Sequence, residues 1–380
     1  MPGGGAYLSP RVITLALQYV GRAVELKDSY KLLRPHLDPL LQSIVFPLVC
    51  FGEEDAELWE QDPQEYIRKG YDVLEDMYST KTAAANLLHV LVTKKAKAGH
   101  LDKVMAQIAG VFVEHAAAAA ATAAAAASAG GGGAAAAAAA AAGSAAAGAV
   151  PVDLARRMDG AMLVVGSLSD VLKSKSPYKE QLETMLMTHV LPCFASPHGH
   201  LRSKAAWVSG CYSDIVFSGC GVGAGPHFML LFERVVNGLH DPELPVRVDS
   251  VVAMRAFVSE LADMDQLKPI LPRLLESIFG LMHEVDSEDL VSTLEAIVEK
   301  LGEDVGPHAL TLAQNLTGAF WRYTQQGDGD EEEDNDDGED CVFRGAGDES
   351  IDTVNRYCRS ILSIDRSINR SVDRSTRTRS

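Results

Sequence analysis

Apolar residues recur along most of the chain at the three- and four-residue spacing of amphipathic helices. Residues 10–27 and 36–50 show this spacing, with Pro10 in a first turn, and Pro47 is expected to kink or end the second helix. A charged connector follows, in which a short helix opens at Pro63 with Asp62 as its N-cap. Further helix pairs are predicted at 81–95 with 100–114, 152–173 with 178–194, 201–216 with 226–239, 245–262 with 267–284, and 288–302 with 306–324.

A repeat of 45 residues underlies the helical pattern. Small or branched apolar residues recur at this interval, at Ala161, Ala206, Val251 and Ala296. Larger apolar residues follow 24 positions later, at Met185, Leu230, Leu275 and Phe320, and arginines precede the first series by four positions, at Arg157, Arg202 and Arg247. A small residue lets one helix approach its neighbour closely, and the larger residue of the second helix fills the remaining space. This period is typical of HEAT and armadillo arrays and predicts an all-α fold, an α-solenoid of HEAT repeats with about six antiparallel helix pairs.

Composition divides the chain into five segments. Helical repeats are expected over 1–115 and 151–326, separated by a low-complexity, disordered Ala/Gly insertion over 116–150. An acidic disordered loop is expected over 327–349, and a low-complexity tail rich in Ser and Arg over 350–380. The insertion is long enough to cross a bilayer, but it lacks Leu, Ile and Phe and is broken by Gly130 to Gly133, so we predict no membrane insertion.

The net charge of −18 argues against nucleic acid as a direct partner, because neutralising phosphates requires Lys and Arg. Ten of the acidic residues lie in one run between positions 328 and 340: Asp328, Asp330, Glu331, Glu332, Glu333, Asp334, Asp336, Asp337, Glu339 and Asp340. The run is interpreted either as a solvated linker or as a loop that attracts a basic protein. A second candidate contact surface contains Trp59, Tyr66 and Arg68, and the alternative for these residues is a turn packed against the repeats.

Motifs for catalysis and cofactor binding are not found. The six cysteines form no CxxC pair and are interpreted as reduced thiols, and the spacing of zinc ligands is absent. The stretch GCGVGAG at 219–225 lacks the third glycine of a dinucleotide loop and has no βαβ unit around it, so it is interpreted as an interhelix loop. No GxSxG, HExxH or P-loop occurs. We therefore predict a binding protein without cofactor or metal, and no enzyme.

Several stretches resemble the importin-β superfamily of nuclear transport receptors, the karyopherins, and in particular its importin seven and eight branch. They are YKLLRPHLDPLLQSIVFPLVCF (30–51), WEQDPQEYIR (59–68), LRSKAAWVSGCYSDI (201–215) and LPVRVDSVVAMRAF (244–257). The resemblance covers about residues 7–325 and implies a monomeric receptor that shuttles between nucleus and cytoplasm. It would bind Ran GTPase, FG-repeat nucleoporins and basic cargo such as ribosomal proteins and histones.

The resemblance extends to the middle of such receptors only. The N-terminal Ran-binding repeats of the family have no counterpart before Tyr7, and its C-terminal repeats have none after Cys341, as expected for a middle fragment from an incomplete gene model. Two alternatives remain open beside nuclear import. One is an export receptor of the same superfamily, in which cargo and Ran-GTP bind together. The other is a HEAT-repeat scaffold with no role in transport.

Overall fold

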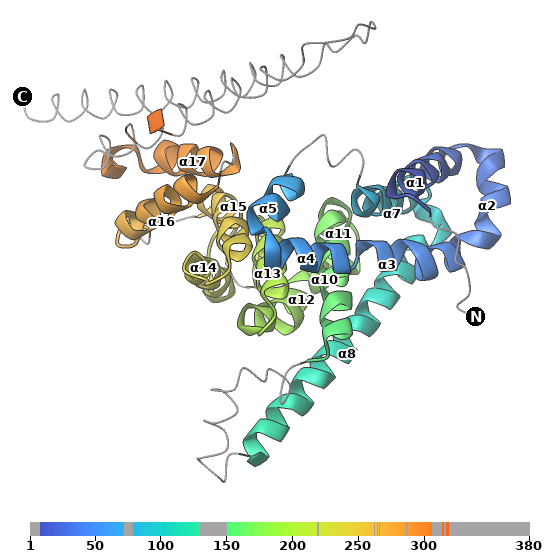
Figure 1. Ribbon diagram of the computed structural model, residues 1–380, viewed down its shortest axis with the longest axis horizontal. Helices are drawn as coiled ribbons and strands as arrows, with labels where there is room; N and C mark the ends of the chain where they lie inside the picture. Colours follow the sequence, from blue (N-terminus) through green and yellow to red (C-terminus); the bar gives the residue numbers. More distant parts are fainter. Residues whose placement is uncertain are drawn as a thin grey trace, which may run out of the picture. The chain divides into compact units, whose positions relative to one another are not determined.

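The structure is a computed structural model, and it describes residues 8–71, 79–129, 150–218, 220–261, 263, 265, 267–285, 288–305, 314 and 317–318. The chain divides into two compact units, Met1–Tyr212 and Ser213–Ser380. Every regular element within the described ranges is a helix (Figure 1), and no strand occurs among them. The prediction of an all-α fold built from HEAT-type helix pairs is confirmed.

The first unit contains most of the helices. They are α1 (Pro10–Glu25), α2 (Lys27–Leu40), α3 (Phe46–Val49), α4 (Glu53–Gln61), α5 (Pro63–Tyr71), α7 (Thr80–Lys94), α8 (His100–Ala129), α10 (Val152–Ser167), α11 (Ser169–Ser174), α12 (Tyr178–Met185) and α13 (Gly199–Cys211). Helix α1 packs on α7, and α10 lies between α8 and α13. The short helix α3 contacts both α7 and α10, so it joins the early helices of the unit to the later ones.

The second unit contains α14 (Pro226–Gly238), α15 (Leu244–Glu260), α16 (Leu271–Glu284) and α17 (Glu288–Val305). Helix α15 contacts the other three helices. Its side chains are buried on several faces, including Val246, Val251, Phe257 and Val258, because neighbouring helices cover it from different sides. The partner helix predicted for α17 at 306–324 lies almost wholly outside the described residues. The glycine-rich stretch forms a turn before α14, with Gly225 at a φ of 99°.

The 45-residue repeat corresponds to the packing of the first helix of each pair. Ala161 on α10, Ala206 on α13 and Val251 on α15 are fully buried, and Ala296 on α17 is half-buried. In the second series Leu275 is buried, whereas Met185 and Leu230 are half-buried, and Phe320 lies outside the described residues. The repeat therefore locates the helices correctly, but it predicts complete burial better for its small members than for its large ones.

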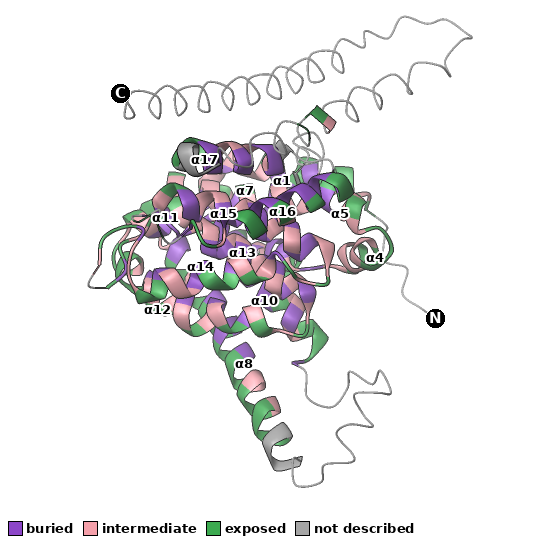
Figure 2. Ribbon diagram, turned by 90° about the vertical axis from the view of Figure 1, so that its left-hand side faces the viewer, coloured by how far each residue is buried: buried purple, intermediate pink, exposed green. Residues whose placement is uncertain are grey.

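Close helix contacts in the core depend on glycine. A Cβ atom added at Gly166 on α10 would lie 2.1 Å from the ring of Trp207 on α13. The same helix contributes a continuous buried face, which appears as purple ribbon in Figure 2 and includes Met158, Met162 and Val165. Since a side chain at position 166 would separate α10 from α13, the glycine sets how closely these two helices approach.

Two helices are interrupted by π-helical turns ahead of a proline. The segments Leu41–Val45 and Leu186–Val190 are π-helical, and they precede Pro47 and Pro192 respectively. Proline has no N–H to donate to the preceding turn, and a wider turn accommodates its ring. The kink or end predicted at Pro47 is confirmed, because α3 ends two residues later at Val49. The helix predicted from residue 36 begins earlier, at Lys27.

Helix α8 is longer than predicted. The expected helix over 100–114 continues to Ala129, so residues 116–129 of the tract expected to be disordered are helical. Alanine has the highest helix propensity, and the packed first half of α8 supplies the nucleus from which the helix extends. Residues 130–149 lie outside the described ranges. By length and composition alone, His100–Ala125 would be sufficient to cross a membrane, and one such helix is weak evidence for a membrane span.

Candidate interaction site at the α4–α5 turn

Helices α4 and α5 form a tight helical turn whose ends are fixed by side chains. The Gly52 amide donates a hydrogen bond of 2.7 Å to Asp55 Oδ2, and the first turn of α4 is acidic, which suits the positive end of a helix dipole. Asp62 then caps α5, since its Oδ1 accepts a hydrogen bond of 2.9 Å from the Glu65 amide, and Pro63 occupies the first helical position. The N-cap predicted at Asp62 is confirmed.

Aromatic rings fill the space beneath this turn. The rings of Trp59 and Tyr66 meet edge to face with centroids 4.9 Å apart, and both approach Phe51, which is buried. On its other side Phe51 stacks on the His200 ring of α13, with a centroid distance of 4.2 Å and an angle of 10° between the planes. Rings in these arrangements stabilise the fold by more than the burial of their apolar area alone. The cluster therefore attaches the α4–α5 turn to α13.

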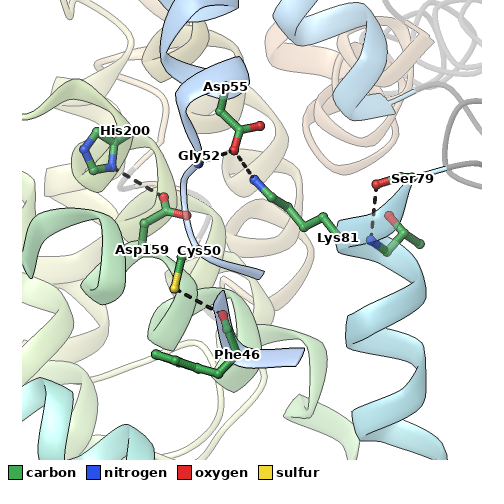
Figure 3. A network of polar contacts seen from close by, with 9 residues as sticks. Phe46, Cys50, Gly52, Asp55, Ser79, Lys81, Asp159 and His200 are labelled. Carbon is green, nitrogen blue, oxygen red and sulfur yellow. Dashed lines mark hydrogen bonds and ion pairs between the residues drawn. The ribbon is translucent and has the colours of Figure 1, made fainter. Parts of the chain in front are cut away.

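A buried carboxylate, Asp159, lies beside His200, whose ring stacks on Phe51 of the aromatic cluster; Figure 3 shows Asp159 and His200. Asp159 of α10 is 2% exposed, and its Oδ1 lies 3.6 Å from His200 Nδ1, an ion-pair distance rather than a hydrogen-bond distance. Burial alone raises the pKa of Asp159, but the positive charges of Lys204 and Lys81 and the imidazole of His200 outweigh it and lower the pKa. The carboxylate is thus ionised inside the protein, where it attracts cationic groups from two other helices.

Two further ion pairs attach α4 to its neighbours. Lys81 Nζ of α7 lies 2.7 Å from Asp55 Oδ2, the same oxygen that accepts from Gly52. The guanidinium of Arg156 on α10 forms a bidentate ion pair with the Glu53 carboxylate, and one of its two hydrogen bonds measures 3.2 Å. These contacts connect α4 to α7 and α10 in addition to the aromatic link to α13. The turn is therefore a firmly attached part of the first unit.

The cysteine at the start of this turn is half-buried and hydrogen-bonded. Cys50 Sγ donates to the Phe46 carbonyl oxygen at 3.2 Å, and burial together with the nearby Asp159 carboxylate raises the pKa of Cys50 to about 12. Burial also raises the pKa of Cys193 to about 12, with Asp159 adding to the effect. Thiolates are the nucleophiles and the metal ligands, and neither thiol ionises near neutral pH. These cysteines therefore have packing roles.

The three predicted contact residues differ in their surroundings. Trp59 and Tyr66 are half-buried within the aromatic cluster, as the packed-turn alternative describes. Arg68 is exposed on α5, and its Nε donates to Glu65 Oε2 at 2.6 Å. Contact of these residues with a partner stays a prediction. The acidic run from Asp328 to Asp340 lies outside the described residues.

Sequence reasoning missed the residues that hold the turn in place, namely Phe51, Asp159 and His200. Asp159 did carry a signal, because it falls on the apolar face of a helix, four residues after Ala155 and three before Met162. A carboxylate at such a position must find cationic partners in the core. Its partners could not be identified from spacing, since His200 and Lys81 belong to other helices.

Within the described ranges, no group of three or more His, Cys, Asp or Glu residues is arranged to hold a metal ion. The described residues form packed helix pairs. The fold thus places the protein among the HEAT-type α-solenoids.

Comparisons with known proteins identify the family. A family model described as Cse1 matches residues 12–124. The chain is 43% identical over 330 residues to the "Importin beta-like SAD2 homolog" of Arabidopsis thaliana, which covers 87% of this chain and 28% of that protein. It is 29% identical to the "Probable importin-7 homolog" of Dictyostelium discoideum, over 83% of this chain and 26% of that protein. It is 27% identical to "Importin-8" of Mus musculus, over 86% of this chain and 28% of that protein.

The chain belongs to the importin-β superfamily, in the branch that contains importin-7 and importin-8. The resemblance seen in WEQDPQEYIR and the other motifs is confirmed. The chain spans between 26% and 28% of the lengths of these three relatives. The relatives are named as importins, and the expectation of a protein without enzymatic activity agrees with that class.

Proposed function

We propose that this chain forms part of a nuclear transport receptor that carries basic proteins into the nucleus under the control of Ran GTPase. The observation that carries the proposal is its 43% identity to an importin β-like protein over 87% of the chain, on an array of helical repeats. Such a receptor works by binding. Cargo and Ran-GTP each lower the affinity for the other, and the coupling is reciprocal.

The charge of the chain supports basic cargo such as ribosomal proteins and histones. Its net charge of −18 attracts cationic proteins, and the Asp328–Asp340 run concentrates ten of the carboxylates. We propose that this run contacts cargo or Ran. Attraction of this kind acts mainly on the association rate and weakens as salt is added.

The cargo proposal is tested by measuring binding of a core histone to the full chain at several salt concentrations. A variant with the ten acidic residues replaced by Ser and Gly should lose affinity at low salt and approach the wild type at high salt. A matched variant with the order of residues 328–340 scrambled keeps the charge and should bind as the wild type does. Equal affinity of the neutralised variant at low salt would contradict the role of the run.

Adding Ran loaded with GTP separates import from the alternatives. Release of the bound histone supports import, whereas joint binding of Ran-GTP and cargo would indicate an export receptor. If Ran-GTP has no effect and FG-repeat peptides do not bind, the results would support the alternative of a scaffold with no role in transport. We propose that FG-repeat nucleoporins bind, and that the receptor shuttles between nucleus and cytoplasm as a monomer.

Arg68 offers a specific test of the α4–α5 turn as a contact surface. Arg68→Ala removes its exposed side chain together with its hydrogen bonds to Glu65. Weaker binding of a Ran or cargo probe, with unchanged thermal stability, supports a contact there. Lys69→Ala is the matched control, because Lys69 is the neighbouring exposed cation and also lies near Glu65, at 3.7 Å. Equal effects of both substitutions would indicate a general charge effect in place of a contact.

A further inference from the structure

The turn between α11 and α12 contains a motif for proline-directed phosphorylation. Residues Ser176, Pro177, Tyr178 and Lys179 place a proline directly after a serine and a lysine three positions after it. Kinases that act on Ser-Pro steps favour proline because their pocket offers no partner to the backbone N–H of the next residue, and proline has none. The lysine pairs with an anionic group of the kinase. Such a short motif is meaningful only in a suitable structural context.

The Ser-Pro step is exposed and lies outside both helices. Helix α11 ends at Ser174 and α12 begins at Tyr178, so Ser176 and Pro177 belong to the turn between them, and both are exposed. The Ser176 hydroxyl donates a hydrogen bond of 3.2 Å to Glu180 Oε2, a contact at the surface. The oxygen that would receive a phosphoryl group is therefore accessible from solvent.

The residues on either side of Ser176 are attached to the preceding helix pair. Lys175 Nζ donates to the carbonyl oxygen of Val92 on α7 at 3.4 Å, and the Tyr178 hydroxyl donates to Asp102 Oδ1 on α8 at 2.7 Å. Helix α10, which precedes α11, packs between α8 and α13. The turn is thus held in place by its flanks and presents the Ser-Pro step to solvent between helices that are packed on both sides.

Two other Ser-Pro steps in the chain, at Ser9 and Ser196, serve as internal comparisons. Neither has a lysine or arginine three positions after the serine, and both serines are half-buried. The hydroxyl oxygen of Ser196 also accepts a hydrogen bond of 3.1 Å from the His198 amide. Among the three steps, Ser176 alone combines the complete motif with an exposed serine.

We propose that Ser176 accepts a phosphoryl group from ATP in a reaction catalysed by a proline-directed protein kinase. The Ser176 oxygen attacks the γ-phosphorus of magnesium-bound ATP, the bond from that phosphorus to the β–γ bridging oxygen breaks, and ADP leaves. The hydroxyl proton passes to the catalytic aspartate of the kinase. The proposal is independent of the proposed transport function, since it needs neither Ran nor cargo.

The phosphate would enter a cationic segment of an acidic chain. Residues 172–180 contain Lys173, Lys175 and Lys179 against Glu180, a net charge of +2. A phosphoserine carries a charge of about −1.5 to −2 at neutral pH. It would repel the Glu180 carboxylate, the present partner of the hydroxyl, and accept hydrogen bonds from the exposed Lys179. Phosphorylation therefore exchanges an acidic partner of position 176 for a basic one.

The site is tested by incubating the full chain with a recombinant cyclin-dependent kinase, Mg²⁺ and ATP, and by locating the phosphate with mass spectrometry. Ser176 should be modified in the wild type, and Ser176→Ala should lose this phosphate. Ser174→Ala is the matched control, because Ser174 is an exposed serine two residues earlier with no proline after it. Lys179→Gln should lower kcat/KM at least fivefold. Circular dichroism establishes that each variant is folded.

Phosphorus-31 NMR tests the exchange of partners. The second pKa of an unperturbed phosphoserine is about 6. Lysine neighbours stabilise the dianion, so this pKa should be lower in the folded chain than in 8 M urea, and Lys179→Gln should raise it toward the value in urea. The acids that face the turn, Glu180 and Asp102 on α8, act in the opposite sense, so Glu180→Gln should lower the pKa further.

Two results would overturn the assignment of the site. They are absence of phosphate from the folded chain after treatment, and modification of Ser9 or Ser196 ahead of Ser176. Equal kcat/KM for the wild type and Lys179→Gln would contradict the role of the lysine in the motif. A phosphate pKa in the folded chain at or above its value in urea would show that the acids outweigh the lysines, and the exchange of partners would be wrong.

Discussion

Gly160 of α10 lies against Cys50 so closely that a Cβ atom at position 160 would be 2.7 Å from the Cys50 sulfur and 2.9 Å from its Cα. The second distance involves backbone, which cannot move aside as a flexible side chain can. This contact brings α10 next to the segment between α3 and α4. It also places Cys50 beside Asp159, whose charge contributes to the raised pKa of the thiol.

Gly160→Ala should therefore lower the free energy of unfolding by about 1–3 kcal/mol, the typical cost of overpacking a core. Urea denaturation measures the change. The matched control is Gly110→Ala on α8, where an added Cβ would meet nothing within 4 Å. That substitution should stabilise the protein by about 0.5–1 kcal/mol, because alanine is the better helix former. Equal effects of the two substitutions would contradict the role assigned to the contact.

Asp159→Asn should reduce stability at neutral pH and flatten its dependence on pH in the acid range. The pKa of Asp159 is lower in the folded state than in the unfolded state. Its charge therefore stabilises the fold above the unfolded pKa of about 4, and this contribution is lost as pH falls through the folded pKa. Denaturation midpoints between pH 7 and pH 3 should fall less steeply for the variant than for the wild type.

The control for this prediction is Asp153→Asn on the same helix, where the carboxylate is exposed. It should change stability by less than about 0.5 kcal/mol and leave the acid dependence as in the wild type. Parallel curves for the wild type and Asp159→Asn would show that the buried carboxylate is not ionised at neutral pH.

Cys50 and Cys193 should react slowly with iodoacetamide in the folded protein. Each has a pKa of about 12, against the ordinary value of 9.0. At pH 8 the thiolate fraction is therefore lower by on the order of a thousandfold than for an unperturbed thiol, and the thiolate is the reactive form. Mass spectrometry of timed samples, in buffer and in 8 M urea, measures the two rates. Comparable labelling in both solutions would contradict the prediction.

Asp62→Ala should lower the free energy of unfolding by about 1 kcal/mol, because α5 loses its N-cap hydrogen bond. Asp62→Asn should retain most of the stability, since an asparagine side chain also accepts from the Glu65 amide. Both variants remove the charge of Asp62, so their comparison isolates the cap hydrogen bond. Thermal unfolding followed by circular dichroism gives the difference, and equal melting temperatures would exclude a capping contribution.

The helices were predictable because their information is local. Apolar spacing located α1, α7 and α10, and the 45-residue repeat identified positions such as Ala161 and Ala206 that are fully buried. The end of α8 was not predictable from this signal, because an alanine tract has no apolar periodicity to continue or to break. Helix propensity and the packed first half of α8 determine its length there.

The candidate site was predicted only in part, for a related reason. Trp59 and Tyr66 stand out in the sequence as large side chains in a charged segment. What holds them is Phe51 and the His200 ring, which meet only after α13 stacks on α10. Asp159 and Lys81 likewise come together through folding. Spacing along the chain reports which residues share a helix face, and it carries no information on which faces meet.

Helix α8 gives the protein a projecting part whose length depends on the number of its alanines. Its outer residues from 116 to 125 are largely uncovered alanines, and the helix projects from its packed neighbours (Figure 1). Each alanine gained or lost in that tract would change its reach by about 1.5 Å and turn whatever follows by about 100° around the axis, without disturbing a single interior contact. Changes in the number of alanine codons would thus alter the length of this projecting helix and leave the packed helices unchanged.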